Sequence, residues 1–167
     1  MDQSFDDKEF RSALGRFATG VVVVSTFHGT RPEGMTIGAF TSVSLAPPLI
    51  AFLPAKSSTT WPKIREAKKF TINILAHDQQ ELCKAFARSS EEKYSGVPWD
   101  MSEHGTPHLA GALGWLDCTL YGEFEAGDHD IALGHVSSIT QGKDRDPLVF
   151  FGGQFHTLDA SETVSKK

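Results

Sequence analysis

The segment that decides the fold runs from residue 34 to residue 48 and reads Gly34-Met35-Thr36-Ile37-Gly38-Ala39-Phe40-Thr41-Ser42-Val43-Ser44-Leu45-Ala46-Pro47-Pro48. It has the length of a strand and ends at two prolines. Yet it is full of small and hydroxylated side chains, whereas a plain core strand carries more bulk. Small side chains allow a ligand to lie close to the backbone, so that main-chain N–H and C=O groups contact its edge. Two interpretations remain: a strand that lines a planar ligand, or a half-exposed strand with a Ser/Thr outer face.

The residues on either side of this segment predict two more strands. Residues 21–27 begin with four valines and predict a fully buried strand. The turn-forming residues 28–34 join it to a second strand over residues 35–45, which makes a hairpin. The two prolines end the second strand, and residues 49–53 predict a third.

A helix is expected before the first strand, over residues 6–17. Phe10, Leu14 and Phe17 follow one another at the spacing of a single helical face. Ser4 is the expected N-cap.

Two further short helices are expected between the strands. Residues 57–67 predict one, capped by Ser57 or Ser58, with Pro62 in its first turn where a missing N–H is harmless. A variant capping box that starts at Asp78 opens the other.

The rest of the chain is expected to be rich in strands. The predicted strands cover residues 70–75, 113–126, 130–141, 148–151 and 154–158. Gly152-Gly153 joins the last two strands as a two-residue hairpin turn. Residues 91–111 have no usable period and are expected to be an irregular loop.

Together these elements predict one domain over residues 1–167, with its core at about 8–158 and a flexible tail over 159–167. The expected class is mostly β with short helices (α+β). Many antiparallel strands around one core favour a closed or nearly closed barrel, because such a barrel leaves few exposed edges.

Composition excludes several classes of function. The net charge is −5 and no run of basic residues occurs, so nucleic-acid binding has no electrostatic footprint. No apolar stretch is long enough to span a membrane, and the acidic N-terminus does not resemble a signal peptide. We therefore expect a cytoplasmic protein in which Cys83 and Cys118 are reduced and buried. His104 and His108 have the spacing of a ligand pair on a helix, but Gly105 and Pro107 lie between them and exclude a helix, so we expect no metal.

A second candidate ligand segment is Lys56-Ser57-Ser58-Thr59-Thr60, which leads into the second predicted helix. Hydroxyl groups, a cation and free N–H groups at a helix start are typical of a phosphate site. The alternative is an ordinary helix cap beside an exposed lysine.

The order of several motifs resembles the short-chain flavin reductase family. The matching pieces are Phe10-Arg11 through Gly20-Val21, Gly34-Met35-Thr36 through Pro48-Leu49, Lys56-Ser57-Ser58-Thr59 with Trp61, Phe70 through Leu75, Gly127-Asp128-His129, and Pro147 through Phe151. The resemblance implies an FMN-binding split β-barrel of Greek-key type that acts as a homodimer. It also implies FMN or FAD as flavin, NADH or NADPH as hydride donor, and a separate partner monooxygenase that receives reduced flavin.

The resemblance further implies positions for the ligand-binding residues. Along the isoalloxazine ring it places Thr36, Ile37, Gly38, Ala39, Thr41 and Ser42, and near the ribityl chain Ser42, Val43 and Ser44. Near the phosphate it places Lys56, Ser57, Ser58 and Thr59, with Phe155 close to the ring and Lys93 in a mobile stretch. His129 corresponds to a histidine beside the flavin and the nicotinamide, and it is the candidate catalytic residue. From the residues alone, the favoured interpretation of His129 is a turn histidine bonded to Asp128 or Asp130.

The function expected on this basis is NAD(P)H-dependent reduction of FMN or FAD, which supplies a monooxygenase. Two alternatives stay open: a split-barrel enzyme that retains its flavin and acts on another substrate, and a non-catalytic flavin-binding protein. The sequence departs from the family at Gly152-Gly153, where an arginine is common, and at Tyr94, where a phenylalanine is common.

Overall fold

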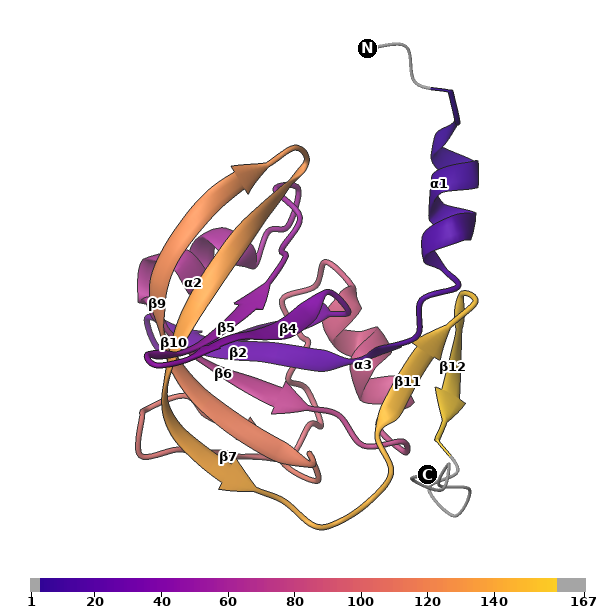
Figure 1. The fold of residues 1–167 in the computed structure, drawn as a ribbon. Helices are drawn as coiled ribbons and strands as arrows, with labels where there is room; N and C mark the ends of the chain where they lie inside the picture. Colours follow the sequence, from indigo (N-terminus) through magenta and orange to yellow (C-terminus); the bar gives the residue numbers. More distant parts are fainter. Residues whose placement is uncertain (1–3, 159–167) are drawn as a thin grey trace.

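The computed structural model describes residues 4–158, which form many β-strands and three short helices, as expected (Figure 1). The helices are α1 (Asp7–Leu14), α2 (Trp61–Ala67) and α3 (Gln80–Ala87). The strands are β1 (Thr19–Gly20), β2 (Val22–His28), β3 (Arg31–Ile37), β4 (Phe40–Leu45), β5 (Pro48–Phe52), β6 (Lys69–Ile74), β7 (Trp99–Met101), β8 (Pro107–Leu109), β9 (Gly114–Ala126), β10 (His129–Gln141), β11 (Leu148–Phe151) and β12 (Gln154–Thr157). The predicted tail, residues 159–167, lies outside the described residues.

Seven strands form one sheet in the order β3-β2-β6-β9-β10-β5-β4. β3 and β4 lie at its opposite edges, although only Gly38 and Ala39 separate them in sequence. The strand predicted over residues 35–45 is therefore two strands joined at a corner. Within residues 4–158 the two edges are not hydrogen-bonded to each other, so the barrel is split and the fully closed alternative is not observed.

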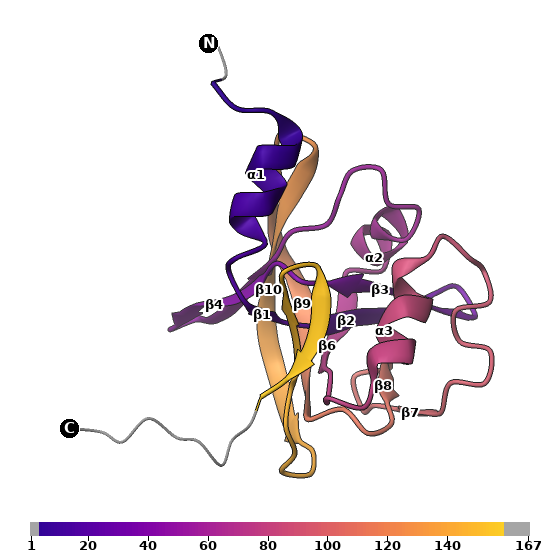
Figure 2. The same ribbon diagram turned by 90° about the vertical axis from the view of Figure 1, so that its right-hand side faces the viewer.

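The core consists of two apolar clusters on the two sides of β2. Val22 and Val24 face the first cluster, which α2 covers with Trp61. Val21 and Val23, on the other side, face the cluster that α3 covers (Figure 2). The prediction of a strand buried on both faces is thus confirmed, and the physical reason is that a helix covers each face.

Both cysteines are free and buried, as expected from the sequence. Burial raises the pKa of the Cys118 thiol to about 12, and it also raises the pKa of Cys83. Each thiol therefore stays protonated at neutral pH and packs as a small apolar group.

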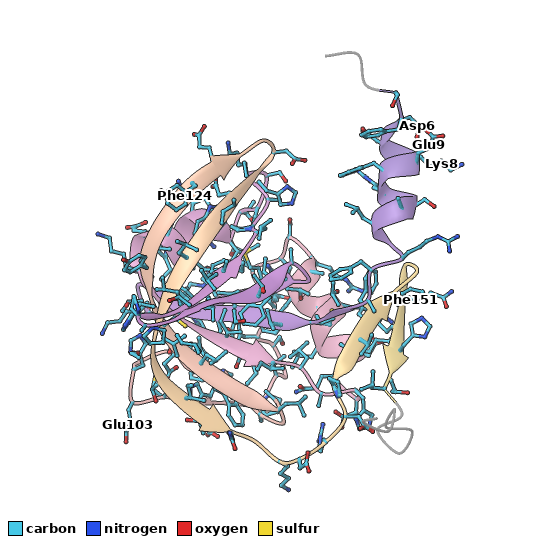
Figure 3. All side chains as sticks on the ribbon, in the orientation of Figure 1. Asp6, Lys8, Glu9, Glu103, Phe124 and Phe151 are labelled. Atoms are coloured by element: carbon cyan, nitrogen blue, oxygen red, sulfur yellow. The ribbon has the colours of Figure 1, made fainter. Side chains whose placement is uncertain are left out.

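The first helix differs from the prediction at both ends. Its N-cap is Asp6, which accepts a hydrogen bond from the Glu9 amide at 2.7 Å, while the Glu9 carboxylate accepts one from the Asp6 amide at 3.0 Å. This capping box replaces the expected cap at Ser4. None of its residues is buried, and α1 stands away from the sheet in Figures 1 and 3.

The other two helices begin later than predicted. α2 starts at Trp61 instead of residue 57, because Ser58 Oγ accepts hydrogen bonds from the amides of Thr60 and Trp61 and holds the preceding turn. α3 starts at Gln80 without the capping box expected at Asp78. Gln79 lies at its N-terminus instead, and its side chain is bonded to the Ala76 amide and the Ala110 carbonyl.

The segment 91–111, expected to be an irregular loop, contains the β7–β8 hairpin. Buried hydrogen bonds fasten this hairpin to the sheet: Ser25 Oγ donates to the Pro107 carbonyl at 2.6 Å, and the Leu109 amide donates to Asn73 Oδ1 at 2.8 Å. Buried polar groups must be paired, so these contacts fix the position of the hairpin.

The β9–β10 hairpin and the β11–β12 hairpin agree with the prediction. β9 and β10 pair antiparallel over most of their length, with two register shifts. β11 and β12 turn at Gly152 and Gly153, which both have positive φ, as a type I′ turn requires. Together with β1 they form a small separate sheet.

Candidate functional site

Three sequence-distant segments from the prediction meet at one end of the β9–β10 hairpin. The Leu53 amide donates to the Ala39 carbonyl at 3.1 Å, which joins the corner between β3 and β4 to the segment after β5. The Lys56 amide donates to the Asp128 carbonyl at 2.9 Å, and Ala55 pairs with His129. The corner, the Lys56–Thr59 segment and the predicted catalytic histidine therefore form one continuous surface. We call the segment of residues 56–59 the hydroxyl loop.

The hydroxyl side chains of this loop fall into two groups: one is bonded within the loop, and the others are exposed to solvent. Ser58 is half-buried, and its Oγ lies 3.2 Å from the amide nitrogens of Thr60 and Trp61. Ser57 and Thr59 are exposed and present their hydroxyl groups to solvent. Ser58 thus shapes the loop, while Ser57 and Thr59 are available to a ligand.

Lys56 adds a cation to this surface but is flanked by acids. Its Nζ lies 3.8 Å from Glu125 Oε2 and 3.9 Å from Asp130 Oδ1. Asp130 is buried and also accepts a 2.8 Å hydrogen bond from Trp61 Nε1, which ties β10 to α2. Reasoning from the sequence missed Asp130 and Glu125 as neighbours of Lys56, since only the pairing of β9 and β10 brings them there.

The His129 imidazole is held by its neighbour in the turn. Its Nδ1 lies 2.7 Å from Asp128 Oδ1, and this hydrogen bond lowers the pKa of the Asp128 carboxyl. An ionised carboxylate only accepts, so Nδ1 carries the proton and Nε2 is left for a ligand. His129 is therefore bonded to Asp128 in the turn, as one of the two interpretations predicted, and its Nε2 is the nitrogen that a ligand could contact.

The remaining predicted residues fall into two β3 residues with inward-pointing side chains and a more exposed group in the corner and β4. Thr36 Oγ1 donates to the Cys83 carbonyl at 2.7 Å, so Thr36 faces α3, and Ile37 is buried in the core. The exposed group consists of Gly38, Ala39, Thr41, Ser42 and Val43, with Ser44 half-buried. The expected flavin contacts of Thr36 and Ile37 would have to run through the backbone, because their side chains point elsewhere.

Phe155 and Lys93 lie outside this surface. Phe155 is half-buried on the small sheet, where its ring packs edge-on to Phe150 at a centroid distance of 5.3 Å. The Lys93 side chain points inward: its Nζ donates to the carbonyl of Gly34 at 2.9 Å, to Thr60 Oγ1 at 3.1 Å and to the Phe86 carbonyl at 3.4 Å. Burial lowers the pKa of Lys93.

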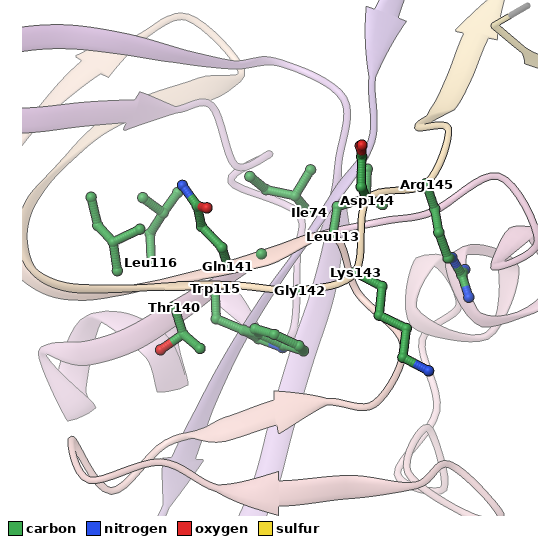
Figure 4. Close-up of a pocket in the computed structure, with 12 residues that line it drawn as sticks. Ile74, Leu113, Trp115, Leu116, Thr140, Gln141, Gly142, Lys143, Asp144 and Arg145 are labelled. Atoms are coloured by element: carbon green, nitrogen blue, oxygen red, sulfur yellow. The ribbon is translucent and has the colours of Figure 1, made fainter. Parts of the chain in front are cut away.

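A groove of about 610 Å³ lies at the far end of the same hairpin (Figure 4). Its lining includes Trp115, Ile139, Lys143 and Arg145, and none of the predicted site residues. Among residues 4–158, no three His, Cys, Asp or Glu side chains group as metal ligands, and no helix is long and apolar enough to cross a membrane.

Comparison with known proteins gives a family match and close relatives. The family described as "Flavin reductase like domain" matches residues 14–159. A "Flavin reductase" of Pseudomonas putida is 42% identical over 153 residues, which cover 91% of this chain and 90% of the relative. An "FMN reductase (NADH) SmoA" of Agrobacterium fabrum is 40% identical over 150 residues, which cover 90% and 85% of the two chains.

Solved structures resemble the whole fold. A nitrilotriacetate monooxygenase component B homologue from Mycobacterium thermoresistibile superposes with a TM-score of 0.93 at 32% identity, covering 97% of this chain and 92% of that one. The NADH:FAD oxidoreductase SgcE6 of Streptomyces globisporus, in complex with NAD and FAD fragments, gives a TM-score of 0.89 at 33% identity, covering 97% and 100%.

Proposed function

Because the chain belongs to the flavin reductase-like family, we propose that it is an NAD(P)H-dependent flavin reductase that acts on FMN or FAD. The observation that carries the proposal is the meeting of the Gly38-Ala39 corner, the hydroxyl loop and His129 on one surface. No residue there needs to be a nucleophile, since a bound flavin itself accepts the hydride from the nicotinamide.

The residues of this surface fit the parts of a flavin mononucleotide. The exposed hydroxyl groups of Ser57 and Thr59 and the Lys56 ammonium suit a phosphate. Gly38 and Ala39 leave the backbone of the corner open to a flat ring, because neither has a bulky side chain. Thr41, Ser42 and Ser44 follow along β4, where they would accompany the ribityl chain.

His129 is the residue that we propose to act on protons. Its Nε2, the nitrogen not bonded to Asp128, would accept a hydrogen bond from the nicotinamide amide when the ring is neutral. It would donate to the ring edge of the flavin when the ring is an imidazolium. Asp128 keeps the proton of the neutral ring on Nδ1, and it stabilises the imidazolium when both nitrogens are protonated.

We also propose that the protein is a homodimer. The apolar residues of α1 are exposed in the single chain, namely Phe10 at 50%, Leu14 at 57% and, just beyond the helix, Phe17 at 75%. A helix that buries none of its apolar face needs a partner surface, and a second copy of the chain supplies one.

A separate monooxygenase is proposed to receive the reduced flavin, and the cytoplasm is proposed as the compartment. The similarity to a monooxygenase component B homologue supports the first point. The two free cysteines, which persist as thiols in a reducing compartment, are in keeping with the second.

The test follows NADH oxidation at the nicotinamide absorbance band, with purified protein and added FMN, and then without FMN. We expect oxidation that requires FMN and saturates with it. Oxidation by protein that keeps a flavin of its own, with no response to added FMN, would favour the flavin-retaining alternative. No oxidation with NADH or NADPH would leave only a binding protein.

A further inference from the structure

Lys93 is a buried cation, and no carboxylate among residues 4–158 lies within ion-pair distance of it. The residue is only 8% exposed. The three ammonium protons have three acceptors from three elements, which are Gly34 in β3, Thr60 before α2 and Phe86 in α3. The charge of Glu33 also acts on Lys93, but the Glu33 carboxylate is paired with another lysine: its Oε1 lies 2.6 Å from Lys63 Nζ. A buried ammonium without an ion pair is costly, so its retention calls for a physical reason.

The contact of Lys93 with Thr60 connects it to the hydroxyl loop. Thr60 is 2% exposed, and its amide is bonded to Ser58 Oγ. Lys93 therefore holds the Thr60 side chain from the protein interior, and the hydrogen bond from the Thr60 amide to Ser58 Oγ connects Thr60 to the hydroxyl loop. The exposed hydroxyl groups of Ser57 and Thr59 lie on either side of Ser58.

The outer surface alone offers a phosphate a poor electrostatic environment. The only cation of the hydroxyl loop, Lys56, lies within 4 Å of two carboxylates, those of Glu125 and Asp130. Asp128 adds a third negative charge at the neighbouring turn. A phosphate bound here needs positive potential from another source, and a cation behind the loop, screened from water, supplies it over a longer range than an exposed one.

We propose that Lys93 is a positioning residue for the flavin phosphate: from inside the protein it holds Thr60 and the hydroxyl loop in place and adds a buried positive charge behind them. This inference rests on the proposed function, because it takes the hydroxyl loop as the phosphate site. It differs from direct cofactor binding, since the ammonium is occupied by protein acceptors.

The test compares FMN with riboflavin, which lacks the phosphate. Dissociation constants for both are measured by quenching of flavin fluorescence, in wild type and in Lys93→Met. We expect the variant to bind FMN about three- to tenfold more weakly and riboflavin about equally well, because only the phosphate senses the lost charge. A merely structural role would weaken both flavins by the same factor.

Lys84→Met is the matched control, because it removes the same charge from an exposed side chain on α3 that pairs with Glu81. We expect it to leave the ratio of the two dissociation constants unchanged. Lys93→Arg should recover part of the preference for FMN, since the charge is kept. Thr60→Val keeps the ammonium but removes one of its acceptors, and it should lower the preference less than Lys93→Met. Thr60→Val decides the question if Lys93→Met does not fold, because it removes one of the contacts through which Lys93 holds the loop.

An unchanged ratio of the two dissociation constants in Lys93→Met, or in Thr60→Val if the first does not fold, overturns the proposal. So does a wild-type protein that binds FMN and riboflavin equally. These results are separate from those on the function, because binding is measured without NADH. A chain that prefers FMN through Lys93 but never oxidises NADH would retain this inference and lose the reductase assignment.

Discussion

At the scale of single residues, His129 and Gly134 show how local geometry limits what the site and the core tolerate. His129 has one nitrogen fixed by Asp128 and one that is free. Gly134 lies where β10 passes Phe70 and Ile50, and a Cβ there would come within 2.7 Å of Phe70 Cζ and 2.9 Å of Ile50 Cδ1. Neither constraint can be inferred from the residue type alone.

If His129 acts on the flavin or the nicotinamide, His129→Ala should lower kcat for NADH oxidation with FMN. We expect a loss of about tenfold or more, because a positioned acid or base contributes at least that much to the rate. His77→Ala, a change at an exposed histidine on another part of the surface, serves as the control. A kcat in His129→Ala equal to that of wild type would assign the proton transfer to a different group.

Gly134→Ala should lower the free energy of unfolding by about 1–3 kcal/mol, since the added methyl group overpacks the core. The measurement is the midpoint of urea unfolding. Gly20→Ala is the matched control, because a Cβ at Gly20 meets nothing within 4 Å. Equal midpoints for the two variants would mean that Phe70 and Ile50 move aside at no cost.

At the scale of elements, the hydroxyl loop separates ligand contact from loop support. Ser57 and Thr59 are exposed, whereas Ser58 Oγ is bonded to two amides. The double change Ser57→Ala with Thr59→Ala should raise the KM for FMN about tenfold and leave kcat nearly unchanged, because we propose that these groups bind the phosphate and not the reacting ring.

Ser58→Ala is the informative comparison for that double variant. It should lower the unfolding free energy by about 0.5–2 kcal/mol, as the loss of a cap does. A double variant with a lowered kcat and an unchanged KM would move the phosphate site elsewhere.

At the scale of the whole molecule, the exposed apolar face of α1 is the basis of the proposed dimer. Its one backbone link to the small sheet is the 2.8 Å hydrogen bond from the Gly152 amide to the Gly15 carbonyl, just after the helix. Phe10→Ala with Leu14→Ala should convert a dimer into a monomer in sedimentation equilibrium, since each buried apolar side chain contributes about 1.5–3 kcal/mol. Ser12→Ala, on the opposite side of α1, should leave the dimer intact. A wild-type chain that sediments as a monomer would contradict the dimer itself.

Most of the strands, the two tight hairpins, the doubly buried β2 and the family could be predicted from the amino-acid sequence. These features depend on alternation, turn residues and motif order, which act over a few neighbouring residues or along the chain. Only the tertiary structure decided the corner at Gly38-Ala39, the pairing of Ala55 with His129 and the inward direction of Lys93. These features join residues that lie far apart in sequence, and which of them meet depends on sheet register and packing across the whole fold.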